Sequence, residues 1–217
     1  MVIRASLPQV SRLSGVCCMP KILVTVTDQR LTAAATSWIE VALFDGALAV
    51  DATVGNGYDT LFLAHRVGPK GMVLGFDVQK AALAGAREVL KFVGSLDRVS
   101  LIHDSHSRLA NYLPAEAAIQ GAMFNLGYLP RGNRQIITRP DTTVMALRDV
   151  LANLAERGRI TILVYRGHEE GILEYVEVRQ FLEQLSDDEW IVEEFVSASD
   201  SPIAPRLFRV QKNLAAD

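Results

Sequence analysis

The fold is decided by one stretch of the chain, DATVGNGYD at residues 51–59. It follows the apolar run ALAV at 47–50 and precedes TLFLA at 60–64. This order predicts a buried strand, a tight glycine turn and the start of a helix. Such a turn lets a small ligand lie against bare backbone at a helix N-terminus. The candidate ligand contacts in the turn are Asp51, Gly55, Asn56, Gly57 and Asp59.

An acidic residue stands at a matching distance from this turn. The run MVLGF at 72–76 ends in Asp77, twenty residues after Gly57. An acid at the tip of the second strand is placed to accept hydrogen bonds from two ribose hydroxyls. The turn and Asp77 together predict a nucleoside-containing cofactor, and this spacing argues against a turn that binds no ligand.

Two features of the turn choose between cofactors. A dinucleotide fingerprint, G-x-G-x-x-G, needs a third glycine, and Thr60 occupies that position. The carboxylates of Asp51 and Asp59 would repel a pyrophosphate, but they would attract a ligand that carries an ammonium and a sulfonium. The pattern D-x-x-x-G-x-G resembles the turn of class I S-adenosylmethionine (SAM) methyltransferases. We therefore predict SAM rather than a nicotinamide or flavin nucleotide.

Composition and charge fit this interpretation. A chain of 217 residues with 49% hydrophobic and 22% charged residues suits one α/β domain. The net charge of −3 argues against broad non-specific nucleic-acid binding, although a local basic patch is compatible with it. Cys17 and Cys18 are adjacent, which predicts neither a structural disulfide nor a metal site and favours a cytoplasmic location. No apolar run reaches the ~18 residues of a membrane span, so no membrane partner is predicted.

The domain boundaries are predicted from pattern alone. Residues 1–26 are interpreted as an N-terminal extension without required order, and Met19 is an alternative start to Met1. Arg4 and Pro8 make the first segment unlike a signal peptide. Residues 27–213 are predicted to form a single methyltransferase domain.

The hydrophobic spacing alternates between strand and helix. Helices are predicted at 31–43, 58–66, 79–93, 108–113, 141–156 and 169–185. Strands are predicted at 47–52, 72–77, 99–102, 121–125, 160–165, 190–197 and 206–211. The alternation predicts a parallel sheet with helices on both faces. The last two strands are joined by too few residues for a crossover helix, so they should pair antiparallel.

These elements predict an α/β, Rossmann-like class I SAM methyltransferase fold. Its sheet is expected to have seven strands, mostly parallel, with one antiparallel strand near the C-terminus. A plain dinucleotide-binding domain would not normally finish in this way.

A second group of candidate residues lies at the end of the fourth predicted strand. Asn125-Leu126-Gly127-Tyr128 resembles the N-P-P-Y motif of amino-methyltransferases, with Leu126 and Gly127 in place of the prolines. The side-chain oxygen of Asn125 and the carbonyl of Leu126 are predicted to accept the N–H bonds of an amine and aim its lone pair. Tyr128 is predicted to stack on a base or pack over the sulfonium. In the alternative, Asn125 caps a strand and Tyr128 is a loop aromatic.

Four segments together resemble one family. They are DATVGNGYDTLFLA at 51–64, GFDVQ at 75–79, HDSH at 103–106 and FNLGYLPRGNRQIITRPDTT at 124–143. They are similar to the small bacterial methyltransferases labelled "putative rRNA methylase" (the YtqB/MnmM family), over about residues 45–210. The resemblance implies SAM-dependent N-methylation of the 5-aminomethyl group of 5-aminomethyl-2-thiouridine at the tRNA wobble position. The residues themselves indicate only a SAM fold with an amine-compatible pocket.

The resemblance also implies roles for single residues. It places cofactor contacts on Asn56, Asp59, Asp77, Gln79, Ser105 and His106, the last two near the adenine. Judged by its type alone, His106 would be a surface or helix-capping histidine. The chain departs from the family pattern at Tyr58, Asp104 and Arg166.

An RNA substrate requires positive charge near the pocket. Arg131, Arg134 and Arg139 follow Tyr128 and are predicted to bind phosphates or stack on anticodon bases, with a solvated loop as the alternative. Tyr165 and His168 either line the substrate pocket or begin the next helix. The predicted partner is tRNA at its anticodon region. The apolar pattern at 31–43 and the resemblance favour a homodimer.

Two questions stay open at this level. Neither residue type nor spacing identifies a general base, so Tyr165, His168 or water remains a candidate. The rival functions are a SAM methyltransferase acting on rRNA, protein or a small molecule, a nucleotide-binding oxidoreductase, and a SAM-fold binding protein without catalysis.

Overall fold

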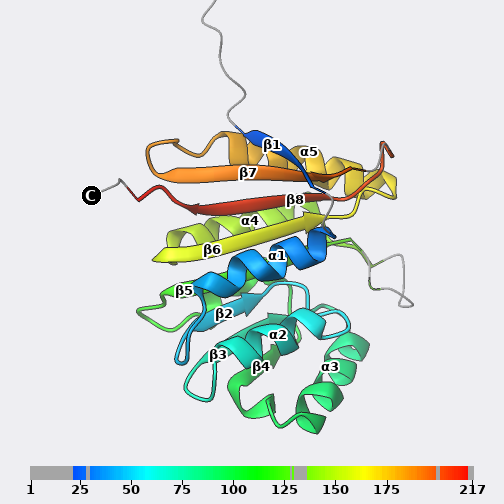
Figure 1. Cartoon of the computed structure of the whole chain (residues 1–217). Helices are drawn as coiled ribbons and strands as arrows, with labels where there is room; N and C mark the ends of the chain where they lie inside the picture. The colour runs from blue at the N-terminus through cyan, green and yellow to red at the C-terminus, as the bar shows by residue number, and fades with distance from the viewer. Residues whose placement is uncertain (1–21, 28–29, 128, 130–135, 199–200, 215–217) are drawn as a thin grey trace, which may run out of the picture.

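The computed structural model describes residues 22–27, 30–127, 129, 136–198 and 201–214. In this part of the chain, eight strands form one sheet with the order β1-β7-β8-β6-β5-β2-β3-β4 (Figure 1). The strands are β1 Leu23–Thr27, β2 Leu48–Asp51, β3 Met72–Phe76, β4 Val99–Ile102, β5 Ile119–Leu126, β6 Leu154–Val164, β7 Trp190–Ser197 and β8 Arg206–Lys212. The helices are α1 Leu31–Ile39, α2 Tyr58–Arg66, α3 Lys80–Phe92, α4 Pro140–Ala152 and α5 Glu169–Glu183. Short 3₁₀ segments are η1 Glu40–Ala42, η2 Leu96–Arg98 and η3 His106–Tyr112.

The direction of the strands confirms the predicted class of fold. Strand β8 runs antiparallel to both of its neighbours, β6 and β7, and all other strand pairs are parallel. The predicted number of strands was one too low, because the sheet also includes β1.

Strand β1 corrects the predicted N-terminal boundary. Four of its five residues, 23–26, fall in the segment that we interpreted as an extension. Leu23 to Thr27 pair with Glu193 to Ser197 of β7 in parallel register. Three of these residues are exposed, so the strand shows none of the buried alternation that marks a core strand in sequence. Its place is set by backbone pairing at the sheet edge.

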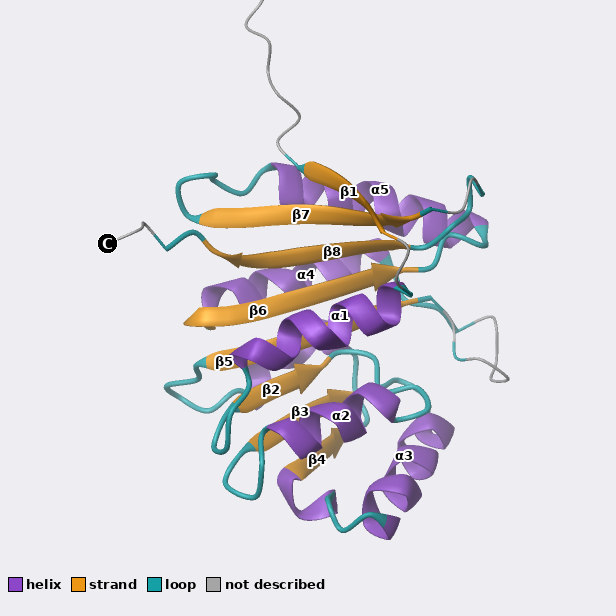
Figure 2. Ribbon diagram, viewed as in Figure 1, coloured by secondary structure: helices purple, strands orange, loops and turns teal. Residues whose placement is uncertain are grey.

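Helices cover both faces of the sheet, as the spacing predicted (Figure 2). Helices α1 and α2 pack with the face that includes Ala49 and Val73. Helices α4 and α5 pack with the face that includes Val50 and Phe124. The apolar side of α1 (Leu31, Ala34, Ala35 and Ile39) is buried within the chain itself. This helix therefore needs no second copy to cover its apolar side, which removes one argument for the predicted homodimer.

The boundary between α4 and β6 differs from the prediction. We expected the helix to continue to 156 and the strand to begin at 160, but β6 begins at Leu154. Leu154 pairs with Ile119 across a register shift, and regular pairing resumes between Arg159 and Gly121. The composition of 154–159 favours a helix, but strand pairing with β5 overrides this local preference.

The strand order places the crevice that holds the candidate site. From β2 the chain adds β3 and β4 in one direction, and from β5 it adds β6 in the other. The switch point between β2 and β5 is where open α/β sheets bind ligands, off the carboxyl ends of the strands. It brings the glycine turn after β2 next to Asn125 of β5. Among the described helices, none is both long and apolar enough to cross a membrane.

Candidate functional site

A cavity of about 1060 Å³ opens at the carboxyl ends of the central strands. The predicted residues that line it are Gly55, Asn56, Asp59, Asp77, Gln79, Ser105, His106, Asn125, Arg139, Tyr165 and His168. Asp51 is fully buried, and Gly57 caps α2, so both support the turn without being part of the lining. Tyr128, Arg131 and Arg134 lie outside the described residues. The fold therefore brings the two predicted groups of residues into one crevice.

The glycine turn depends on the backbone of Gly57. This residue caps α2 with a φ of 78°, a left-handed conformation that side chains rarely adopt. A Cβ added here would lie 2.8 Å from the Cβ of Ala86 in α3. Gly57 thus permits both the turn and the close approach of α3.

Gly57→Ala should destabilise the protein by about 2–4 kcal/mol, because left-handed strain and overlap with Ala86 add together. Thermal unfolding measures this as a lower Tm. The matched control is Gly85→Ala on α3, where an added Cβ meets no atom within 4 Å. That variant should be neutral or slightly more stable, since alanine is the better helix former. Equal Tm values for the two variants would contradict this account of the turn.

Asp77 ties the second strand to the turn. Its Oδ2 accepts a hydrogen bond from the Gly55 N–H at 2.8 Å, and its Oδ1 accepts one from the Gln79 N–H at 2.8 Å. A carboxylate oxygen has lone pairs for further donors, so these bonds leave room for ribose hydroxyls. The two backbone bonds orient the carboxylate before any ligand arrives.

Two further acids lie close together beneath the turn. Asp51 accepts hydrogen bonds from the Thr53 N–H at 3.0 Å and from the Thr60 hydroxyl at 2.5 Å. Burial, and then the nearby charge of Asp59, raise the pKa of Asp51 to about 7. Burial also raises the pKa of Asp59. Thr60 replaces the third glycine of the dinucleotide pattern. Its hydroxyl donates a hydrogen bond to Asp51, one of the two acids that distinguish this turn.

Asn125 is held at the junction of the two groups of residues. Its backbone N–H donates to the Thr53 hydroxyl at 2.8 Å, and its side-chain nitrogen donates to Oδ2 of Asp59. An ionised carboxylate only accepts hydrogen bonds, so the amide must present its NH₂ group to Asp59. This leaves the amide oxygen of Asn125 for another donor. The sequence had not indicated that Thr53 holds the backbone of Asn125 or that Asp59 orients its side chain.

The Leu126 carbonyl, predicted to accept from an amine, has a partner within the sheet. Leu126 is fully buried and does not line the cavity. Its carbonyl accepts the Tyr165 N–H at 3.0 Å, which continues the pairing of β5 with β6. The next carbonyl, of Gly127, accepts the Thr138 N–H at 3.1 Å. Of the two acceptors predicted for an amine, only the Asn125 side chain lines the cavity.

Tyr165 and His168 both line the cavity, and His168 also begins the next helix. The Nδ1 of His168 accepts the Gly171 N–H at 2.9 Å as the cap of α5, so this residue both faces the cavity and begins the helix. Burial, and then the charge of Asp59, raise the pKa of Tyr165 above its usual value. Tyr165 therefore stays protonated near neutral pH, which argues against it as a general base.

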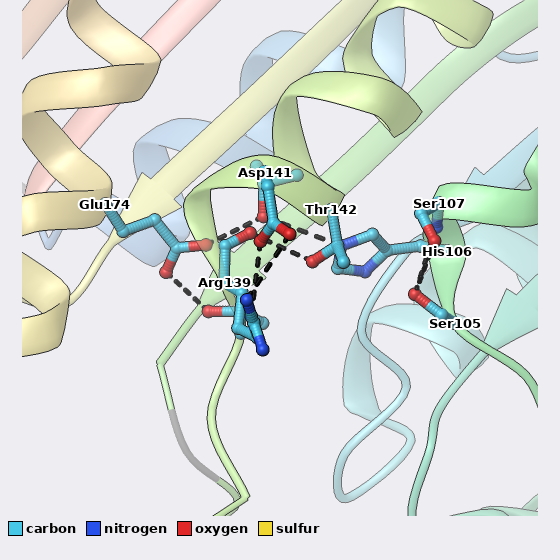
Figure 3. Close-up of polar contacts among 9 residues, drawn as sticks. Ser105, His106, Ser107, Arg139, Asp141, Thr142 and Glu174 are labelled. Atoms are coloured by element: carbon cyan, nitrogen blue, oxygen red, sulfur yellow. Dashed lines mark hydrogen bonds and ion pairs between the residues drawn. The ribbon is translucent and has the colours of Figure 1, made fainter.

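His106 is buried at the side of the cavity and is not a surface residue. Its Nδ1 lies 3.0 Å from the Ala52 carbonyl, and its Nε2 lies 3.5 Å from the Thr143 hydroxyl. The Thr143 hydroxyl also lies 2.7 Å from Oε1 of the buried carboxyl of Glu174. Figure 3 shows Glu174 and His106 on opposite sides of the start of α4. Thr143 belongs to a segment that carries the family resemblance. Glu174 was not predicted from the sequence, because an acidic residue in a helix is usually exposed to solvent.

Two other polar residues that line the cavity, Arg139 and Ser105, have simpler roles. Arg139 lines the cavity, is largely exposed and forms an ion pair with Asp141 at 3.2 Å. Ser105 caps η3 by accepting the Ser107 N–H. Among the described residues, no group of three His, Cys, Asp or Glu side chains could hold a metal.

The sheet order, the reversed β8 and the crevice at the switch point define a class I methyltransferase fold. The family model described as "Putative rRNA methylase" matches residues 73–211, and the chain belongs to this family.

Two solved structures support the same assignment. A putative rRNA-methylase from Clostridium thermocellum is 36% identical, with a TM-score of 0.82 over 86% of this chain and 100% of that one. A putative methyltransferase from Streptococcus mutans, solved in complex with SAH, is 34% identical, with a TM-score of 0.77 over 85% of this chain and 99% of that one.

A curated relative carries a more specific name. The chloroplastic tRNA (mnm(5)s(2)U34)-methyltransferase of Arabidopsis thaliana is 37% identical over 176 residues, which are 77% of this chain. The matched region spans 64% of that relative's own length.

Proposed function

We propose that the protein is a SAM-dependent N-methyltransferase whose acceptor is the 5-aminomethyl group of the tRNA wobble 2-thiouridine. The observation that carries the proposal is the placement of Asn125. Its side chain is held by Asp59 of the glycine turn and faces the same cavity as Asp77. One crevice thus presents acids suited to a cationic nucleoside beside an amide oxygen suited to an amine. The names of the Arabidopsis and Streptococcus relatives agree with this acceptor and this cofactor.

The cavity fits SAM in shape and charge. The turn offers backbone N–H groups, Asp77 offers oxygens for ribose hydroxyls, and Asp59 offers a carboxylate for the ammonium or sulfonium. Gln79, Ser105 and His106 line the side assigned to the ribose and adenine. When bound, SAM supplies an electrophilic methyl group, and its transfer to an amine nitrogen leaves S-adenosylhomocysteine.

The chain's own contribution is to orient and desolvate the acceptor. An alkylamine has a pKa near ~10, like a lysine, and reaches the pocket charged. Desolvation lowers such a pKa and favours loss of the proton to water before the methyl transfer. The Asn125 oxygen then accepts an N–H bond and turns the nitrogen lone pair toward the methyl group. Tyr165, His168 and Arg139 are assigned to substrate contact, together with Arg131 and Arg134, and no dedicated base is required.

Cofactor affinity should depend on pH. A cationic ligand favours the ionised form of Asp51 and Asp59, so the affinity for SAM should rise from pH 6 to pH 8, by up to ~10-fold per unit for one proton. The stability of the protein without SAM should change with pH in the opposite sense. Because the folded pKa of Asp51 is raised to about 7, its stabilising effect is present at low pH and is lost as pH rises toward 7.

Calorimetry in buffers of different ionisation enthalpy should detect protons released on SAM binding. Asp51→Asn cannot titrate and should flatten the pH dependence. A wild-type affinity that is constant from pH 6 to pH 8 would show that the acids are already ionised.

The proposed function is tested by mass spectrometry of tRNA nucleosides. Cells that lack the gene should accumulate 5-aminomethyl-2-thiouridine and lose its methylated form. Purified protein with SAM should restore the methyl group on that tRNA in vitro. Loss of a methyl group from rRNA, with tRNA unchanged, would reject this acceptor.

An rRNA nucleoside is the second candidate acceptor, because the family description names rRNA methylation. The same mass spectrometry, applied to rRNA, separates the two. A cytoplasmic location and a homodimer belong to the proposal as well, and light scattering of the purified protein tests the second of these.

A further inference from the structure

A chain of hydrogen bonds connects the glycine turn to the segment that follows Asn125. It runs from the Ala52 carbonyl through His106, Thr143, Glu174 and Thr138 to the Gly127 N–H. Glu174 lies at its centre on α5 and is 1% exposed. The proposed methyl transfer assigns no role to this buried acid.

The donor in each of these hydrogen bonds can be assigned by starting at the Ala52 carbonyl. The Ala52 carbonyl can only accept, so Nδ1 of His106 carries a hydrogen. His106 is 7% exposed, and burial lowers its pKa, which favours a neutral ring. In a neutral ring the other nitrogen, Nε2, has a lone pair and must receive its hydrogen bond from the Thr143 hydroxyl.

This assignment fixes the state of Glu174. A hydroxyl has one hydrogen, and that of Thr143 is already directed to His106. The short contact of 2.7 Å between Thr143 Oγ1 and Glu174 Oε1 then needs its hydrogen from Glu174. On the other side, Thr138 accepts the Gly127 N–H at 2.9 Å and donates to Oε2. Every hydrogen bond in the chain is satisfied if Glu174 carries one proton.

We propose that Glu174 is a neutral carboxylic acid and acts as a positioning residue for the end of β5, which carries Asn125. It joins Thr143 of α4 to Thr138, which forms two hydrogen bonds with Gly127. Burial raises the pKa of Glu174, in agreement with a protonated acid. The functional part of this inference, an oriented Asn125, rests on the proposed function, whereas the protonation state does not.

Other charged groups near Glu174 do not supply a partner that would hold it ionised. His168 caps the same helix and favours the charged form only as the weakest of the influences on Glu174. Arg139, at the start of α4, pairs with Asp141 instead. The one alternative with the same number of protons is an ionised Glu174 with a doubly protonated His106.

Nitrogen NMR of the His106 ring separates these two states in the wild-type protein. We expect the neutral Nδ1–H form at pH 6, with the signal assigned by its loss in His106→Asn. Glu174→Gln should leave this form unchanged, because an amide also donates on one side and accepts on the other. A doubly protonated ring in the wild type would overturn the proposal.

Thermal unfolding gives an independent readout. At pH 4, where glutamate is largely protonated in the unfolded chain as well, Glu174→Gln should have nearly the same Tm as the wild type. As pH rises above the unfolded glutamate pKa of ~4.3, only the wild type should lose stability relative to the glutamine variant, because its unfolded form ionises while its folded form stays neutral. Equal pH dependence of the two Tm values would contradict a neutral acid. Thr143→Val should lower the Tm by about 2–6 °C, since it leaves two buried groups unpaired.

Thr142→Val is the matched stability control, because Thr142 is adjacent and only half-buried, and its hydroxyl donates to the Arg139 carbonyl instead of contacting Glu174. Equal Tm values for the two valine variants would show that this chain of hydrogen bonds contributes nothing to stability. With tRNA as substrate, Thr143→Val should lose about 10-fold or more in kcat/KM, whereas Glu174→Gln should stay within about 2-fold. If the proposed function is wrong, only this activity comparison fails, because NMR and unfolding require no substrate.

Discussion

Replacing Asn125 with alanine should lower kcat for methyl transfer about 100-fold or more while leaving the Kd for SAM within about 3-fold. The variant removes the amide oxygen that is free to accept an amine N–H. It also removes the donor to Asp59, but Asp77 and the backbone of the turn remain in place. Single-turnover kinetics and calorimetry measure the two quantities separately.

Asn153→Ala is the matched control for this variant. Asn153 follows α4, and its side chain donates only to the Asp149 carbonyl, away from the cavity. Its kcat should equal that of the wild type. If Asn125→Ala lost affinity for SAM as strongly as it lost turnover, then Asn125 would belong to the cofactor site and not to the acceptor site.

Asp77→Ala should reduce the affinity for SAM about 100-fold. Two hydrogen bonds from ribose hydroxyls to a charged acceptor are worth roughly 3 kcal/mol together, and each 1.4 kcal/mol is a factor of ten. The substitution also leaves the N–H groups of Gly55 and Gln79 without their acceptor, so the turn itself should loosen. Calorimetric titration with SAM and with S-adenosylhomocysteine measures the loss.

Asp97→Ala provides the comparison, because Asp97 is an exposed acid that contacts Arg98 outside the cavity. It should bind SAM as the wild type does. An Asp77→Ala protein that kept wild-type affinity would show that the carboxylate serves only to fold the turn.

The parts of the fold that depend on burial could be predicted from the sequence. Strands β2, β3 and β5 are short apolar runs, and α3 repeats its apolar residues at helical spacing, so local pattern and tertiary position agree. Strand β1 and the start of β6 could not be predicted. Their place comes from hydrogen bonds with strands far away in the chain, which leave no local signal.

The candidate site likewise has parts that could be predicted from the sequence and parts that could not. Apolar strand runs and glycines mark where the site residues lie in the sequence. They allowed us to predict the turn at 51–59, Asp77 and Asn125. The sheet bond of the Leu126 carbonyl could not be predicted, since motif spacing does not say which carbonyl pairs with a neighbouring strand. Glu174 was missed because its function depends on threonines of two other segments, which only the folded chain brings to it.

The position of β8 has a consequence for how the protein is made. This strand is the last element in the chain, yet it lies between β6 and β7 and is the only described strand that joins β7 and β1 to the rest of the sheet. During synthesis, β7 can pair only with β1 until residues 206–212 have left the ribosome, so neither strand is joined to the rest of the sheet before then. The cofactor half, from β2 to β6, can assemble earlier, whereas β7 and β1 can join it only after β8 has been made.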